Sequence, residues 1–321
     1  MPYTCPVSEL IKSELAGFGK RLAKELHSNV GFIKEISEGL VSAGGKRLRP
    51  SLSLLAGKLL GVSSETSIQV ALTVELTHSA TLLHDDLIDN AETRRGSESA
   101  FRRYGSVVSV MSGDFMLARA LGLLASLNNS EFTRLMSETA TQICEGEVLQ
   151  LQMASDEAWD FDRYRQVIEG KTAVLFAAAI EGVGLFSGRS VQELVALRSF
   201  GISYGRAFQM RDDYLDLMGD EKLMGKPVGG DLREGNGTYP VLWLLEAGID
   251  EAQTILRRRA SEDGDISRMV DLVRHYGADK LTKEQIAKDI REAKKALEIF
   301  PTSEARTCLI ELAELEISRV E

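Results

Sequence analysis

A long stretch without proline limits the folds that this chain can adopt. No proline occurs between Pro50 and Pro227 of the 321-residue sequence. Proline is the residue that helix interiors tolerate least, so its absence favours long helices. Through the same stretch apolar residues recur at steps of three and four, as in VALTVELTHSATLLHDD and FTRLMSETATQICEGEVLQLQ. The pattern predicts an all-α fold.

Short polar clusters separate the predicted helices. They are rich in Gly, Ser and Asn, have the length that joins neighbouring helices in a bundle, and lie at 42–45, 61–65, 94–99, 127–131 and 186–190. Asn-Gly occurs in EGNGTYP, but without the alternating strands of a hairpin. Repeats and dividing linkers are also missing, so the sequence predicts one helical bundle over residues 1–321.

The charge and cysteine content narrow the function and the compartment. A net charge of −10 disfavours nucleic acid or an anionic membrane surface as the main partner. The three cysteines are far apart and lack a CxxC spacing, which favours a reducing compartment. The apolar stretch TAVLFAAAIEGVGLF is short and contains Glu181, which suits a core helix better than a transmembrane segment. We therefore expect a soluble, cytoplasmic protein.

Two acidic triplets carry the strongest chemical signal. A helix over 68–90 places Asp85 and Asp89 on one face, with Asp86 beside them. The same DDxxD spacing recurs in DDYLD, at Asp212, Asp213 and Asp216. One such triplet could be an acidic helix end that faces water, but two copies inside apolar helices are rare. Oxygen ligands without His or Cys suit Mg²⁺, which commonly bridges to substrate phosphates.

Basic and polar residues accompany the acidic triplets. Each could be a solvated surface charge when taken alone, but together they alternate with the acids as a diphosphate site requires. The segment GGKRLRP places cations after a glycine pair at a predicted helix start, where backbone N–H groups also favour anions. The candidates are Lys46, Arg47, Arg49, Arg94, Arg95, Lys171, Thr172, Gln209 and Lys226.

From about residue 40 to 245 the sequence resembles the trans-isoprenyl diphosphate synthases, also called polyprenyl synthetases. The motifs that carry the resemblance occur in the family's order and are GGKRLRP, HDDLIDNAETRRG, GEVLQL, GKTAVLF, FQMRDDYLD and GKPVGGDLREG. The resemblance implies an isoprenoid synthase bundle around a central deep cavity. It also implies head-to-tail condensation of isopentenyl diphosphate with an allylic diphosphate, and a homodimer.

The resemblance also assigns roles to individual positions. Asp85, Asp89 and Asp212 are implied as the closest Mg²⁺ ligands, in a site that holds three ions with bound diphosphate. Asp86, Asp213 and Asp216 complete the two acidic motifs. The residues implied for the allylic diphosphate are Arg94, Lys171, Thr172, Gln209 and Lys226, and those implied for isopentenyl diphosphate are Lys46, Arg49, His78 and Arg95.

The chemistry of the reaction agrees with these roles. Cleavage of the allylic C–O bond leaves a carbocation and a diphosphate of increased negative charge, which Mg²⁺, Lys and Arg stabilise. No side-chain nucleophile is required, and the sequence shows no Ser/His/Asp or Cys/His constellation. A lone His on an apolar helix is usually a hydrogen-bonded core residue, but His78 lies seven residues before Asp85 and therefore on the same face.

Small residues before the first acidic triplet predict a long product. Val74, Thr77 and Ala80 form one ridge along the predicted helix. In the family, the fourth and fifth residues before the first Asp help to set the product length, and here they are Thr81 and Ala80. One helical turn, about 5.4 Å, is comparable to one isoprene unit. Without a bulky plug we expect products longer than C20, with Met136 as a candidate floor.

A glycine-rich segment follows the second acidic triplet. Residues 219–240 are predicted to form either a lid that closes over bound diphosphate or a disordered surface loop. Family members usually have Lys where this chain has Asn236, so one positive charge is missing, and weaker binding of the diphosphate or of the third metal ion is expected.

Other functions fit the sequence less well. A shorter-chain C15 or C20 synthase is the nearest alternative. A class I terpene cyclase would not need GGKRLRP or a second DDxxD. A di-iron carboxylate bundle would need two Glu-x-x-His pairs, and only Glu75 and His78 supply one. A non-catalytic partner subunit typically lacks the acidic motifs, which this chain keeps.

Overall fold

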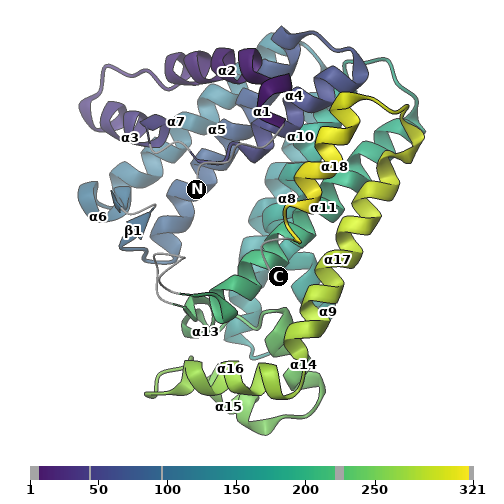
Figure 1. Cartoon of the computed structure of the whole chain (residues 1–321). Helices are drawn as coiled ribbons and strands as arrows, with labels where there is room; N and C mark the ends of the chain where they lie inside the picture. Colours follow the sequence, from purple (N-terminus) through teal and green to yellow (C-terminus); the bar gives the residue numbers. More distant parts are fainter. Residues whose placement is uncertain (1–6, 43–44, 95–96, 221–227, 318–321) are drawn as a thin grey trace. The chain divides into compact units, whose positions relative to one another are not determined.

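The structure is a computed structural model, and it describes residues 7–42, 45–94, 97–220 and 228–317. Helices account for most of these residues (Figure 1), and the prediction of an all-α fold is confirmed. The chain divides into two compact units, which are described separately here. The first unit comprises Met1–Ala140, Leu175–Arg198 and Ile299–Leu312, and the second comprises Thr141–Val174, Ser199–Glu298 and Ala313–Glu321. The single domain over 1–321 stays a prediction.

The first unit is built around α5 (Ser64–Ile88), which packs against α7 (Ser106–Leu127), α4 (Leu48–Leu60) and α2 (Lys12–Glu25). Helix α5 begins where the Ser63 hydroxyl accepts a hydrogen bond from the Thr66 amide at 3.1 Å, which caps its N-terminus. It ends before Asn90, whose φ of 51° is left-handed. The smaller helices of this part of the chain are α1 (Val7–Leu10), α3 (Gly31–Ser42) and α6 (Ala100–Tyr104).

Two very short strands, β1 (Thr93–Arg94) and β2 (Ser97–Glu98), form an antiparallel pair after α5. The sequence predicted only a break here, because two-residue strands are too short to show an alternating pattern. Helix α7 is long and apolar enough to cross a membrane by length and composition alone, a test that core helices of soluble proteins also pass. One side of α7 packs on α5, and the other exposes Val107, Met111 and Leu121.

The helices that follow α7 carry the second acidic triplet and its predicted polar neighbours. They are α8 (Ser130–Ser155), α9 (Phe161–Ile168), the π-helical turn η1 (Glu169–Ala173), α10 (Val174–Gly184) and α11 (Val191–Met218). Helix α10 is the apolar stretch around Glu181, and it is buried as predicted.

The remaining helices of the second unit form a small core of their own. Leu217 near the end of α11 packs there with residues such as Val241, Leu256 and Met269. Figure 1 shows α15 and α16 side by side near the lower end of the chain trace, and the two are in contact. These helices are α13 (Gly230–Glu234), α14 (Tyr239–Glu246), α15 (Asp250–Arg257), α16 (Asp265–His275) and α17 (Ala278–Ala296). They are followed by η2 (Leu297–Ile299) and by α18 (Glu304–Glu314), most of which belongs to the first unit.

Candidate active site

The first acidic triplet occupies the C-terminal end of α5. Asp86 is buried, Asp85 is half-buried, and Asp89 is exposed at the cap position just after the helix. The Asp89 amide donates to the Asp85 carbonyl at 2.8 Å, so the backbone keeps its helical course through the cap. The i, i+4 relation predicted for Asp85 and Asp89 is therefore present, and both carboxylates are accessible enough to bind a cation.

The GGKRLRP segment contains one basic side chain with a structural role and two that are candidates for binding an anion. Arg47 is the cap residue of α4, with a left-handed φ of 47°, and its guanidinium forms an ion pair with the buried Glu75 of α5. Arg49 lies two residues further on, with its guanidinium 4.2 Å from the centre of the Phe176 ring. Lys46 is exposed. Because Arg47 is used to hold α4 on α5, Lys46 and Arg49 remain the candidates for binding an anion.

The predicted channel wall is part of α5. Ala80 and Val74 are fully buried, and Thr77 is buried with its hydroxyl donating to the Thr73 carbonyl at 2.9 Å. Thr81 is half-buried and donates to the carbonyl of His78, which is itself half-buried. Both threonine hydroxyls are thus satisfied within the helix, and the ridge presents small, largely apolar surfaces.

The second acidic triplet lies near the end of α11, and its three carboxylates differ in environment. Asp212 has 44% of its side chain exposed, whereas Asp213 and Asp216 are buried. The Tyr164 hydroxyl of α9 donates to Asp213 at 2.7 Å, and the Gln209 amide donates to its other oxygen at 2.7 Å. Burial nevertheless raises the pKa of Asp213 from 3.8 to about 6.

A hydrogen-bonded chain connects this triplet to the π-helical turn. The Thr172 hydroxyl donates to the Gln209 side-chain oxygen at 2.7 Å, so Thr172, Gln209 and Asp213 form one continuous network. Lys171 is held by two residues of α8, with its ammonium 2.7 Å from the Glu147 carboxylate and 2.7 Å from the Gln150 oxygen. A π-helical turn is uncommon and is frequently found at functional sites. Here it turns both Lys171 and Thr172 toward polar partners.

Two motif glycines allow this turn to approach α8 closely. A Cβ atom added at Gly146 would lie 2.8 Å from the Lys171 backbone nitrogen, and one at Gly170 would lie 2.8 Å from the Gln142 carbonyl oxygen. Neither backbone atom can move aside as a flexible side chain could. The glycines of GEVLQL and GKTAVLF are therefore needed for backbone-to-backbone packing.

Asp216 anchors the segment that follows α11. The Asp231 amide, in the first turn of α13, donates to the Asp216 carboxylate at 3.0 Å. Asn236, two residues after the end of α13, donates from its side-chain amide to Glu234 at 3.0 Å. The amide that replaces the family's usual Lys is thus paired with a neighbouring carboxylate. Residues 221–227, which form part of the predicted lid at 219–240, lie outside the described residues.

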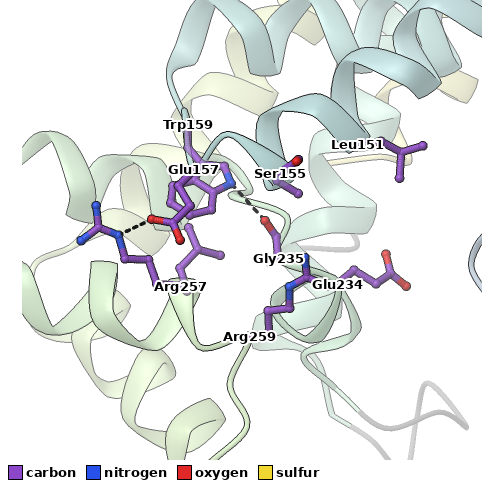
Figure 2. A pocket seen from close by; sticks show the side chains of 10 residues that line it. Leu151, Ser155, Glu157, Trp159, Glu234, Gly235, Arg257 and Arg259 are labelled. Atoms are coloured by element: carbon purple, nitrogen blue, oxygen red, sulfur yellow. Dashed lines mark hydrogen bonds and ion pairs between the residues drawn. The ribbon is translucent and has the colours of Figure 1, made fainter.

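A cavity of about 330 Å³ lies beside Gly235 (Figure 2), and none of the predicted site residues lines it. The Trp159 ring donates to the Gly235 carbonyl at 3.0 Å, and Arg257 pairs with Glu157 at 2.8 Å. Helices α8, α13 and α15 all end next to this cavity, where their C-termini favour a cation. Arg257 and Arg259 supply such charges, so these arginines suit a structural role better than diphosphate binding.

The structure therefore brings together part of the predicted site. In the second unit, the π-helical turn joins two groups of contacts. Thr172 belongs to a hydrogen-bonded network with Gln209, Asp213 and Tyr164, and the adjacent Lys171 contacts Glu147 and Gln150 of α8. Tyr164, Glu147 and Gln150 were not predicted from the sequence. The only feature of the sequence that could have pointed to Glu147 and Gln150 is that both lie in the GEVLQL motif. The Arg94 side chain, Arg95 and Lys226 lie outside the described residues. Among the described residues, no three Asp, Glu, His or Cys side chains form a complete metal-binding group. The predicted residues in these two groups of contacts are Lys171, Thr172, Gln209 and Asp213.

The buried Asp213 carboxyl should lower the stability of the fold. Its pKa is raised to about 6 in the folded state, so stability is lost as the pH rises from about 4 to about 6. We expect Asp213→Asn to raise the free energy of unfolding by roughly 1 to 3 kcal/mol at pH 7.5, with little gain at pH 4. Urea unfolding in EDTA at both pH values measures this. An equal change at both pH values would contradict the prediction.

Comparison with known proteins places this arrangement among prenyl-transferring enzymes. The polyprenyl synthetase family model matches residues 30–273. The octaprenyl diphosphate synthase of Escherichia coli K12 is 35% identical over 98% of both chains. Component 2 of the heptaprenyl diphosphate synthase of Geobacillus stearothermophilus is 32% identical, over 94% of this chain and 95% of the relative. A polyprenyl synthase from Caulobacter crescentus CB15, crystallised with calcium and isoprenyl diphosphate, superposes with a TM-score of 0.91 at 37% identity, covering 97% of this chain and 96% of that one.

Proposed function

The chain belongs to the polyprenyl synthetase family, and from this premise we propose that its two acidic triplets and the π-helical turn bind the diphosphates of the reaction. As a family member it is a prenyltransferase, which condenses isopentenyl diphosphate with an allylic diphosphate to a product longer than C20. The residue roles, the metal and the assembly are proposals.

Magnesium is the metal that suits the donor atoms. The candidate ligands Asp85, Asp89 and Asp212 offer only carboxylate oxygens, and the last two are the most accessible members of their triplets. Mg²⁺ binds through one or two carboxylates and takes its remaining ligands from water and phosphate, so a complete protein cage is not required. When bound, three such ions would neutralise the diphosphate and stabilise the charge that develops on it.

The protein's own residues then bind and orient the substrates. Lys171 and Thr172, with Gln209, are proposed to hold the allylic diphosphate, because the π-helical turn fixes the first two and the hydrogen-bonded network fixes the third. Arg94 and Lys226 are proposed to complete that site. Lys46, Arg49, His78 and Arg95 are proposed to hold isopentenyl diphosphate. The buried apolar ridge of α5 is proposed to exclude water from the reacting carbons.

The observation that carries the proposal is the hydrogen-bonded network of Thr172, Gln209 and Asp213, with Lys171 next to Thr172 on the same π-helical turn. Labelled isopentenyl diphosphate, Mg²⁺ and each allylic primer in turn, followed by sizing of the products, provide the test. We expect chains longer than C20. A C15 or C20 end point would favour the shorter-chain alternative, and a cyclic hydrocarbon would favour a terpene cyclase. No product in the absence of another protein would favour a partner subunit.

The ridge on α5 is proposed to set the product length. Ala80→Phe places a ring in the wall of the proposed channel, so we expect the main product to become shorter by several isoprene units, as measured by chromatography of the dephosphorylated products. Ser79→Ala, at a buried position on the opposite side of α5, is the control and should leave the length unchanged. Products of unchanged length from Ala80→Phe would exclude this ridge as the channel wall.

The exposed apolar side of α7 is proposed to be the surface of a homodimer. Val107, Met111 and Leu121 recur at helical spacing and are each more than half exposed, which is unusual for a monomer's surface. Leu121→Glu is expected to convert the dimer to a monomer in sedimentation velocity experiments.

The relative named as a component 2 favours a second possibility, a complex with a different subunit. A wild-type protein that stays monomeric in the same experiments would support that possibility.

A cytoplasmic location is also proposed.

A further inference from the structure

Arg211 is a charged residue that is almost completely removed from solvent, with 1% of its side chain exposed. It lies on α11 immediately before Asp212. A buried guanidinium is costly unless carboxylates and hydrogen bonds compensate it. The residues that contact Arg211 therefore indicate its role.

Two carboxylates compensate Arg211 within the described part of the chain. One is Asp212, whose Oδ1 accepts from the Arg211 Nε at 3.1 Å. The other is Glu316, in the turn after α18, which forms an ion pair with the same guanidinium and is 2% exposed. The Tyr204 hydroxyl donates to Glu316 at 3.0 Å. The Phe208 ring lies 4.5 Å from the guanidinium carbon and covers it.

The two carboxylates differ in their access to a cation. Glu316 is buried and is therefore not accessible to an ion from solution, whereas Asp212 is 44% exposed and can bind one. With Glu316 present, one positive and two negative charges leave a net negative charge at Asp212. Without it, the guanidinium and Asp212 would neutralise each other, and the attraction for a divalent cation would fall.

We propose that Glu316, acting through Arg211, is a positioning residue that keeps the carboxylate of Asp212 available for magnesium. The proposal rests on the proposed function, in which Asp212 is a magnesium ligand. It assigns to the turn after α18 a role in metal binding that neither acidic triplet reveals.

The test is magnesium binding to the full-length protein with inorganic diphosphate present, measured by isothermal titration calorimetry. Glu316→Gln keeps the size and the hydrogen-bond acceptor but removes the charge, and we expect its Kd for magnesium to rise roughly tenfold. Combining it with Arg211→Met removes the competing cation, and the Kd should return to the wild-type value or below. In turnover, Glu316→Gln should raise the magnesium concentration for half-maximal rate and leave the KM for isopentenyl diphosphate unchanged.

Asp289→Asn provides a matched control. Asp289 is a buried carboxylate that pairs with Arg206 of α11 at 2.7 Å, and Arg206 has no contact with Asp212 among the described residues. The control should lose stability as Glu316→Gln does, yet bind magnesium as the wild type does. If Glu316→Gln fails to fold, Tyr204→Phe removes only the hydrogen bond to Glu316 and should weaken magnesium binding about twofold.

The outcomes separate this inference from the proposed function. A wild-type protein that binds no magnesium with diphosphate would overturn both. Normal binding by the wild type and equal binding by folded Glu316→Gln would overturn the role of Glu316 alone. An equal loss of affinity in Asp289→Asn would do the same, because it would trace the effect to general destabilisation.

Discussion

Asp212→Asn is expected to reduce kcat by roughly 10²- to 10³-fold, the loss typical of removing one group that stabilises developing charge. Asp212 is the most exposed carboxylate of the second triplet and is the one proposed to bind magnesium directly. Asparagine is nearly the same size, but it lacks the charge and so binds Mg²⁺ weakly. Initial rates at saturating substrate measure the change. Isothermal titration of magnesium with diphosphate should show the same loss without any turnover.

Asp271→Asn is the control for this substitution. Asp271 is an exposed carboxylate on α16, and the change removes the same charge far along the sequence from both triplets. Its kcat should stay within a factor of two of the wild-type value. A comparable loss in both variants would show that the net charge of the protein matters, and a wild-type rate for Asp212→Asn would exclude Asp212 as a metal ligand.

Gly170→Ala is expected to destabilise the fold by about 1 to 3 kcal/mol and to reduce the rate more than the stability alone explains. The added methyl group would lie 2.8 Å from the Gln142 carbonyl oxygen and 3.2 Å from the Gly146 Cα, so α8 and the π-helical turn must separate. Lys171 would then lose its short contacts with Glu147 and Gln150. Urea unfolding gives the stability, and the KM for the allylic diphosphate at a temperature where the variant is folded gives the effect on the site.

Gly19→Ala makes the same chemical change where there is room for it. Gly19 lies within α2, and a Cβ atom there would meet nothing within 4 Å. Because alanine favours helices, this variant should gain up to about 1 kcal/mol. If the free energy of unfolding falls for Gly170→Ala and rises for Gly19→Ala, the effect at Gly170 is due to the close approach of two backbones. The same sign at both would exclude that explanation.

The helices and the candidate residues were accessible from the sequence because both depend on local patterns. The predicted helix at 68–90 is observed at Ser64–Ile88, and its start is explained by the Ser63 cap. The spacing of Asp85 and Asp89 fixes their common face once the helix is known. The all-α fold follows from the same periodicity, since helical hydrogen bonds are local.

The supports of the site were not accessible, because each depends on contacts between segments far apart in the sequence. The π-helical turn needs Gly170 to meet Gly146, and an apolar periodicity contains no sign of that meeting. Tyr164 reads as one of several aromatic residues on an amphipathic helix until its hydroxyl is seen at Asp213. The pairing of Arg211 with Glu316 joins positions more than a hundred residues apart, and each reads locally as a surface charge.

The geometry of the site also depends on the exact number of residues in the π-helical turn at Glu169–Ala173. A π-helical turn contains one residue more than an α-helical turn would need. Removing any single residue from it would let the segment relax into an ordinary α-helix. Each residue of an α-helix advances by about 100° around the axis, so Lys171 would rotate away from Gln150 and Thr172 away from Gln209. Insertions and deletions here should therefore be far more harmful than substitutions, even those that preserve every hydrophobic contact.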